Sequence, residues 1–280
     1  MFFDQPRIPP PAPRVRGRVC YALAMVLLSV AVVCAAPQQA PPGHVLSVGE
    51  DLIYNVRYGP FDLGSVRIRA LDRQQLGNYL VYYCRAFIDS YPKIPFVDIH
   101  ATFESYVDTM VYSHKFIGRL KQDDRWDFAR YTFDYERKKA VLEKGWSDTA
   151  LARRDTVMLD RVFQDGLSLF FYARDQLFSG KNVVVPTMIN EQMVTTRINF
   201  EGKRDAVEID AVDYPVDVVG FDGTADFTGI YGMTGGFEGW FSNDDARIPI
   251  MAKMKVLVGS VTIELMRWKR EGWTPPRAKG

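Results

Sequence analysis

Apolar and polar residues alternate along most of the chain from residue 52 onward. In the segment 52–58, every second residue beginning with Leu52 is apolar, whereas Asn55 and Arg57 have the opposite parity. A period of two residues is typical of a strand with one buried face. The same alternation recurs in about fourteen segments: 52–58, 65–70, 78–90, 99–108, 112–121, 126–136, 139–146, 183–189, 192–201, 206–212, 223–228, 235–242, 248–258 and 260–269. This pattern predicts an all-β fold, a large antiparallel meander that curls into a barrel or half-barrel to protect its edges.

One segment, 165–178, breaks the alternation and has the signals of a helix. It begins with Asp165, a capping residue, and stops before Gly180. Its apolar residues cover nearly the whole circumference, which is typical of a buried helix. We therefore expect the helix to fill part of the interior of the curved sheet. Arg174 shares the apolar side and needs a carboxylate partner if it is buried.

The N-terminus has the order of residues of an export signal. Three arginines, the last of them Arg18, precede an uncharged run from Val19 to Ala36 that ends in small residues. We expect a signal peptide at 1–36 cleaved after Ala35 or Ala36, although an uncleaved membrane anchor is an alternative. Val33 in front of Cys34 argues against a lipoprotein. A linker at 37–45, one β-rich domain at 46–270 and a C-terminal tail at 271–280 would follow.

Removal of the signal changes the composition. The 280 residues carry a net charge of +1, with 47% hydrophobic and 13% aromatic residues. Four of the 35 basic and one of the 34 acidic residues lie in 1–36, so 31 basic and 33 acidic residues remain, a charge near −2. This balance excludes a dedicated nucleic-acid binder, which needs a clustered basic excess. Cys84 is then the one remaining cysteine, and its strand-like surroundings favour a buried structural thiol.

Candidate catalytic and metal-binding residues are sparse. The histidines are far apart, with His44 in the linker and His100 and His114 in the predicted domain, so we expect no metal ion. No familiar catalytic or cofactor-binding motif occurs. The polar segment 242–249 is best interpreted as an Asx-type hairpin turn rather than a calcium loop. In a second interpretation, an aspartate of this turn pairs with an arginine, Arg247 or Arg174.

The aromatic residues leave two interpretations open. The chain after residue 36 retains 34 of the 37 aromatic side chains, many at strand positions. They would serve ordinary core packing, because aromatic residues suit strands. A closed or half-closed sheet of so many strands also encloses more volume than its side chains readily fill. An apolar cavity partly occupied by the helix is therefore the second interpretation.

Several short motifs resemble one family of proteins. They are the segment 49–54 with Gly64, Asp165-x-Leu-Ser168 leading to Ala173-Arg174, Asp244-Asp245-x-Arg247-x-Pro249, and a closing strand from Gly259 to Leu265. With them, residues 46–270 resemble the bacterial domain-of-unknown-function family 3108. The resemblance implies an exported envelope protein and supplies no catalytic residues. It also implies a recurring element, a helix cap with an arginine–carboxylate network that fastens helix to hairpin, formed by Asp165, Ser168, Arg174, Asp244, Asp245 and Arg247.

Three classes of function are compatible with these features. The first is a periplasmic or envelope protein that binds a lipid or another apolar molecule in the curved sheet, with the helix as plug or lid. The second is a structural or assembly factor that binds an envelope protein through a sheet edge or through the hairpin 235–240, which carries Trp240. The third is a hydrolase of envelope polymers or lipids that uses Asp244 and Asp245. The absence of a catalytic motif favours the first two.

Overall fold

A computed structural model describes residues 45–94, 98–122, 124–228, 234–256 and 259–279. The expected signal peptide, the linker up to residue 44 and His44 lie outside these residues. All the described residues belong to one unit, 39–280. Within them, no helix is both long enough and apolar enough to cross a membrane.

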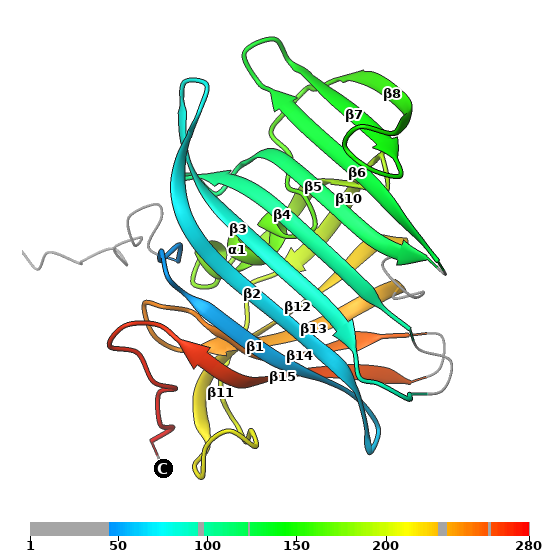
Figure 1. The fold of residues 1–280 in the computed structure, drawn as a ribbon. Helices are drawn as coiled ribbons and strands as arrows, with labels where there is room; N and C mark the ends of the chain where they lie inside the picture. The colour runs from blue at the N-terminus through cyan, green and yellow to red at the C-terminus, as the bar shows by residue number, and fades with distance from the viewer. Residues whose placement is uncertain (1–44, 95–97, 123, 229–233, 257–258, 280) are drawn as a thin grey trace, which may run out of the picture. The chain divides into compact units, whose positions relative to one another are not determined.

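The chain forms one large antiparallel sheet and a short helix (Figure 1). The strands follow the order β8-β7-β6-β5-β4-β3-β2-β1-β15-β14-β13-β12-β10-β9, and β11 pairs with β12. The helix α1 is Ser168–Gln176. The strands are β1 Asp51–Tyr58, β2 Phe61–Leu76, β3 Tyr79–Ser90, β4 His100–Asp108, β5 Ser113–Gln122, β6 Arg125–Asp134, β7 Lys139–Gly145, β8 Leu151–Met158, β9 Asn182–Ile189, β10 Gln192–Asn199, β11 Arg204–Val207, β12 Val216–Thr228, β13 Thr234–Ser242, β14 Pro249–Lys255 and β15 Ser260–Lys269.

The predicted curved meander is confirmed, and the sheet is not closed by hydrogen bonds. Its two outer strands are β8 and β9. Each edge carries features that hinder pairing with another chain: β8 has charged side chains, and β9 contains Pro186. The backbone of Gln164 also bridges to β9, where it donates to Pro186 O at 2.9 Å and accepts from Met188 N at 2.8 Å. Protection of the edges thus does not require a closed barrel.

Some boundaries differ from those that the pattern predicts. Strand β8 is missing from the prediction because most of its residues are exposed, so no apolar alternation marks it. Strand β12 begins at Val216, before the predicted start at 223, and this added part pairs with β11 and, at Val216, with Arg277 of the tail. The helix spans 168–176, within the predicted 165–178. The edge position of β8 and the pairing of β12 with distant segments explain the differences between the strands.

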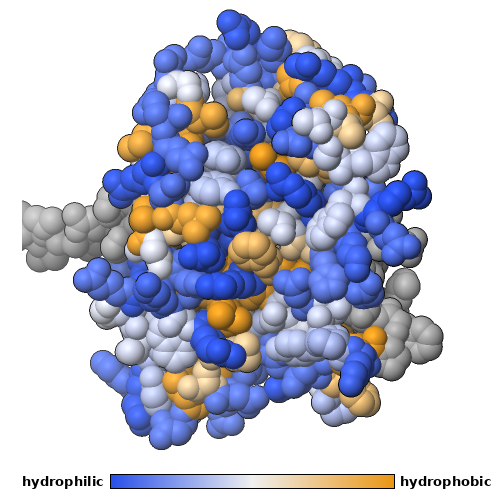
Figure 2. Space-filling model, in the orientation of Figure 1, coloured by the Kyte–Doolittle hydropathy of each residue, from blue (hydrophilic) through white to orange (hydrophobic). Residues whose placement is uncertain are grey.

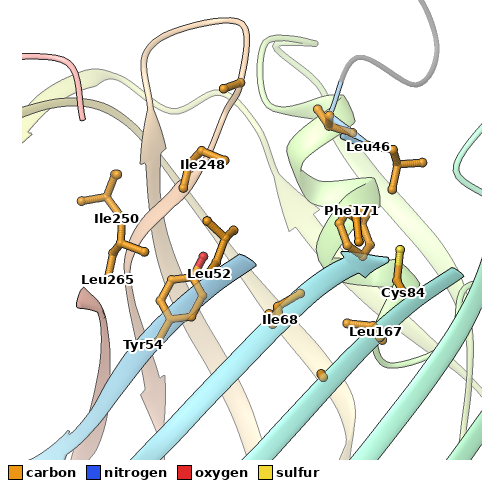
Figure 3. Close-up of a cluster of buried hydrophobic side chains, with 14 of the residues drawn as sticks. Leu46, Leu52, Tyr54, Ile68, Cys84, Leu167, Phe171, Ile248, Ile250 and Leu265 are labelled. Carbon is orange, nitrogen blue, oxygen red and sulfur yellow. The ribbon is translucent and has the colours of Figure 1, made fainter. Parts of the chain in front are cut away.

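The core lies between the helix and the inner face of the sheet. Phe171 and Leu167 of the helix segment pack in one cluster with strand residues such as Ile68 and Cys84 (Figure 3). Two further clusters flank it, one around Phe116 on β5 and β6 and one around the aromatic side chains of β12 and β13. The helix therefore stands inside the curve, behind the strands β2 and β3 in Figure 1.

The C-terminal tail pairs with the start of β12 through an antiparallel bridge between Val216 and Arg277. Asp217 N donates to Pro276 O at 2.7 Å, and Ala278 N donates to Pro215 O at 2.9 Å. Trp273 and Trp268 contact edge-to-face with their ring centroids 5.8 Å apart. Trp273 also packs in the same cluster as Val216 and Val218 of β12.

Glycines on the inner face give room to aromatic rings. A Cβ at Gly239 would lie 2.4 Å from the ring of Phe221, and a Cβ at Gly223 would lie equally close to the ring of Phe237. Each ring therefore lies flat on the backbone of the neighbouring strand. These two glycines set the position of the aromatic side chains on β12 and β13.

We expect Gly239→Ala to lower the free energy of unfolding by about 1–3 kcal/mol, because the added methyl group displaces the buried Phe221 ring. Urea denaturation measures this change. Gly166→Ala is the matched control, since its Cβ would meet only Ile189 Cδ1, at 4.0 Å. Equal stability of the two variants would contradict the close packing at Gly239.

Candidate functional site

A cavity of about 560 Å³ lies between α1 and the inner face of the sheet. Its walls come from both halves of the sheet and from the helix. Most of the lining side chains are apolar, among them Val66, Ile68, Ile88, Phe103, Phe116, Leu120, Leu167, Leu169, Phe170, Met188, Ile198, Phe221, Phe237, Phe241, Met251, Met254 and Ile263. The aromatic residues of the inner face thus surround a space that they do not fill.

Part of the cavity wall consists of glycine and alanine residues, whose side chains occupy little or no space. Gly118, Gly235, Gly236 and Gly239 line the cavity and add no side-chain volume. Ala252 faces Gly239 across β13 and β14 and lines the cavity as well. Aromatic rings alternate with these small residues; Phe116 and Tyr131, for example, stack with their centroids 5.1 Å apart. The small residues maintain a space into which an apolar chain can fit.

Polar groups border the cavity mainly at the strand ends opposite the helix. Lys255 lies at the end of β14, and Lys144 of β7 pairs with Glu191 at 3.0 Å. Tyr131 donates its hydroxyl hydrogen to the same Glu191 at 3.1 Å. These contacts join β6 and β7 to the turn between β9 and β10, across the gap that the open sheet leaves. Near the helix, the buried hydroxyl of Tyr54 has no hydrogen-bond partner among the described residues.

The start of the helix is held by Asp165, which is completely buried. Its Oδ1 accepts hydrogen bonds from the backbone N–H groups of Leu167 and Ser168 at 2.7 and 2.8 Å. Its Oδ2 accepts from the hydroxyls of Ser105 and Ser113, both at 2.5 Å. Burial raises the pKa of Asp165 above its ordinary value, although these four hydrogen bonds oppose the shift. Asp165 therefore caps the helical turn and ties it to β4 and β5.

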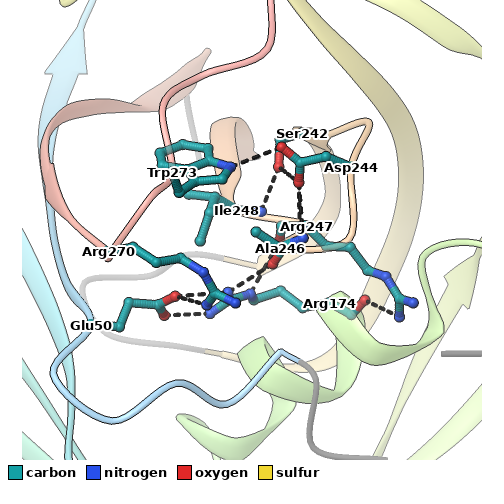
Figure 4. A network of polar contacts seen from close by, with 9 residues as sticks. All are labelled: Glu50, Arg174, Ser242, Asp244, Ala246, Arg247, Ile248, Arg270 and Trp273. Atoms are coloured by element: carbon teal, nitrogen blue, oxygen red, sulfur yellow. Dashed lines mark hydrogen bonds and ion pairs between the residues drawn. The ribbon is translucent and has the colours of Figure 1, made fainter. Parts of the chain in front are cut away.

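The end of the helix is held by an ion pair between Arg174 and Glu50 (Figure 4). Both side chains are buried, and the two Nη atoms of Arg174 donate to the two carboxylate oxygens at 2.6 and 3.0 Å. Arg270 donates to the same carboxylate at 2.5 Å. Two further Arg174 hydrogens, on Nη2 and Nε, are donated to the carbonyl groups of Ala246 and Arg247, at 2.9 and 3.1 Å. Each nitrogen of the buried guanidinium thus donates at least one hydrogen bond.

A polar turn between β13 and β14 completes this network. Asp244 Oδ1 accepts from the backbone N–H groups of Ala246 and Arg247, both at 3.0 Å, which is the geometry of an Asx turn. Its Oδ2 accepts from Trp273 Nε1 at 2.8 Å. Arg247 Nη1 donates to the carbonyl groups of Asp175 and Arg174, at 2.6 and 3.2 Å. Burial lowers the pKa of Arg247, while the charge of Asp175 opposes that shift.

The predicted site residues form two clusters in the structure, and two of them lie outside both clusters. Asp165 and Ser168 lie at one end of the helix, whereas Arg174, Asp244 and Arg247 lie at the other. Asp245 is exposed and acts on Arg247 through its charge. Trp240 lies on the outer face, beneath Lys253, and does not line the cavity.

The partner of Arg174 is the residue that reasoning from the sequence missed. The sequence predicts that a buried Arg174 needs a carboxylate partner, and its second interpretation of the turn offers Asp244 or Asp245; the ion pair joins Arg174 to Glu50 instead. Glu50 stands in the motif 49–54 but carries no local sign of burial, since it lies 124 residues from Arg174. Position in that motif is the one available signal.

The histidines and the cysteine have structural environments. His100 pairs with Asp89, its partner on β3, at 2.8 Å, and buried His114 pairs with Asp108, also at 2.8 Å. Cys84 is a buried free thiol, and burial raises its pKa. Among the described residues, no three side chains of the metal-ligating types gather into a group that could hold an ion.

Comparison with known proteins agrees with this architecture. The family described as "Protein of unknown function (DUF3108)" matches residues 53–266. The chain belongs to this family. The match spans β1 to β15 and includes the helix and the Asx turn of the Arg174 network. No curated protein matches the DUF3108 chain.

Of the solved structures that the chain resembles, the first described below supports the fold. A beta-barrel-like protein of domain of unknown function DUF1849 from Brucella abortus superposes with a TM-score of 0.51 at 13% identity, over 79% of this chain and 96% of that one. A Bacteroides fragilis protein described as exported, with a YmcC-like fold, gives a TM-score of 0.35 at 6% identity, over 80% and 97%. A protein described as a lipoprotein from Parabacteroides distasonis gives 0.32 at 9%, over 80% and 96%. At these identities, the likeness to the first shows a shared fold only.

We expect Arg174→Ala to lower the free energy of unfolding by about 3–5 kcal/mol, because it breaks a buried ion pair and frees two buried carbonyl groups. Thermal or urea denaturation measures the loss. Arg161→Ala is the control, because Arg161 is exposed and pairs only with its neighbour Asp160; we expect no measurable change there. Unchanged melting of Arg174→Ala, with lost ligand binding, would place Arg174 in a binding site instead.

Proposed function

We propose that this protein is exported to the cell envelope and binds a lipid-like apolar molecule inside its curved sheet. The observation that supports this proposal is the cavity of about 560 Å³ bounded by apolar side chains. Pockets that bind small molecules commonly have volumes of about 300–1,000 Å³ and largely apolar walls. Water inside an apolar cavity of this size has an unfavourable free energy. Displacement of that water by an apolar ligand would be favourable.

The helix would act as the closed end of the ligand site. Phe170, Leu167 and Ala173 line the cavity, while Phe171 packs into the core on the other side. Asp165 at its start and Arg174 at its end fix the helix to the sheet. The ligand would therefore enter between the strand ends opposite the helix, where Lys255, Lys144 and Glu191 border the cavity. A polar end group of the ligand would stay among these charged residues.

Export follows from the order of residues at the N-terminus, where basic residues precede the uncharged run 19–36. A protein that carries lipid in the envelope needs such a signal. We place the protein in the periplasm or outer envelope on this ground.

The two other functions have weaker support from the structure. Binding of an envelope protein through the sheet edge β8 would have to overcome the charges of Arg153, Arg154 and Asp155, which hinder strand addition. Hydrolysis by Asp244 would require a free carboxylate, whereas Oδ1 of Asp244 accepts hydrogen bonds within the turn and Oδ2 accepts one from Trp273. The enclosed apolar cavity therefore favours ligand binding over these two other functions.

Extraction of the purified protein tests the proposal directly. The full chain is produced with its own N-terminus, purified without detergent and extracted with organic solvent for mass spectrometry. We expect a stoichiometric lipid-like molecule, and a fluorescent fatty acid, dansyl-undecanoic acid, should bind after its removal. Protein that yields no ligand and does not bind the dye would contradict the proposal.

A bulky side chain inside the cavity should weaken ligand binding without unfolding the protein. We expect Ala252→Phe to weaken binding of dansyl-undecanoic acid by about tenfold or more, because the phenyl ring occupies the space opposite Gly239. Fluorescence titration measures the change. The control is Ala206→Phe, which places the same ring on an exposed residue of β11. Equal affinities of the two variants would argue against the cavity as the site.

A further inference from the structure

The outer face of the sheet carries a row of arginines that runs across the strands. Arg69 on β2 faces Arg85 on β3, and Arg85 faces Glu104 on β4. On β6 to β8, Arg130 faces Glu143, which faces Arg154. Ile117 of β5 joins the two parts, because it faces both Glu104 and Arg130. Register partners thus form one continuous line from β2 to β8, about 29 Å long at the usual strand spacing.

These side chains point away from the cavity. The residues next to them in each strand, such as Ile68, Ala86, Phe103 and Gly118, line the cavity, and successive side chains of a strand alternate between faces. Figure 1 shows β2 to β7 side by side on the near face, and Figure 2 shows strongly hydrophilic side chains across the same face. The row therefore belongs to the convex surface. Arg119, which has the same parity as Ile117 on β5, also lines the cavity, whereas the other arginines of the row do not.

In this row, each carboxylate lies within ion-pair distance of two arginines. Asp51 pairs with Arg67 and Arg69, at 2.5 and 3.4 Å. Glu104 pairs with Arg119 and Arg85, at 2.9 and 3.3 Å.

The third carboxylate, Glu143, pairs with Arg130 at 2.6 Å and lies 3.7 Å from Arg154. The arginine row, which we define as Arg67, Arg69, Arg85, Arg119, Arg130 and Arg154, thus has six positive charges and shares three negative ones.

The acids lie below the arginines. The Glu143 side chain is 8% exposed and that of Arg154 is 69% exposed; the corresponding fractions are 15% for Asp51 and 44% for Arg67. Arg130 and Arg67 hold the pKa values of Glu143 and Asp51 below their ordinary range, so both acids are ionised at neutral pH. A molecule at the surface therefore meets guanidinium groups, each with donors left over from its ion pair.

We propose that the arginine row binds a linear anionic polymer, one whose carboxylate or phosphate groups repeat along the chain. Excess positive charge in a line, with planar guanidinium donors at the surface, suits such a partner. The line crosses the strands of a curved sheet, so it follows the convex surface. A flexible polymer can follow that curve over its whole length, whereas a flat membrane would contact only part of it.

The test is binding of the full protein to two polymers, polygalacturonate and inorganic polyphosphate, measured by titration at several salt concentrations. We expect Arg69→Gln, Arg85→Gln and Arg130→Gln together to weaken binding by roughly tenfold at 0.15 M salt and to make it less dependent on salt. The matched control replaces Arg137, Arg161 and Arg204 by Gln; each pairs with one carboxylate away from the row. Equal losses in the two triple variants would overturn the proposal, because net charge alone would then explain binding.

A double variant separates binding from folding. Arg67→Gln with Arg154→Gln leaves each carboxylate paired with its other arginine, so we expect unchanged melting and clearly weaker polymer binding. Polygalacturonate and polyphosphate distinguish the carboxylate from the phosphate as the preferred group, and binding of either supports the proposal. Binding to phosphatidylglycerol vesicles without binding to either polymer would overturn it and indicate a membrane surface.

Discussion

The ion pair between Arg174 and Glu50 is the interaction on which the rest of the structure depends. It joins the only helix of the described residues to the start of β1, and through Arg270 to the end of β15. Ala246 and Arg247 attach the turn after β13 to the same guanidinium. The middle of an open sheet is therefore attached to the helix at one point, at the helix end that borders the cavity.

A buried arginine is tolerated here because each of its three guanidinium nitrogens donates to a carboxylate or a carbonyl group. Desolvation of an ion pair costs more than its attraction returns unless further hydrogen bonds satisfy the remaining donors. Two carbonyl groups of a turn that is itself shaped by Asp244 meet this need. At the other end of the helix, Asp165 has four donors and no cation, which is sufficient for a carboxylate that caps a helical turn.

Much of the fold can be read from the sequence, because a sheet with one buried face imposes a period of two on its residues. The prediction fails where that constraint is absent, as at β8, which has no buried face. The site is harder to predict. Arg174 reveals its need for a partner by its place among apolar residues, but Glu50 is selected by contact across 124 residues, which no local pattern contains. The cavity depends on packing, so the aromatic residues alone left its existence open.

The two faces of the sheet would serve different ligands under the proposed functions. Small and apolar side chains keep the inner face hollow, and the outer face raises its arginines above their carboxylates. Both arrangements use the same strands, since alternate residues of β2 to β7 belong to opposite faces. A crystal structure of the protein purified from the envelope without detergent would decide whether the sheet holds a ligand. We expect elongated density between the helix and the strand ends near Lys255, whereas a collapsed interior filled by its own aromatic side chains would contradict ligand binding.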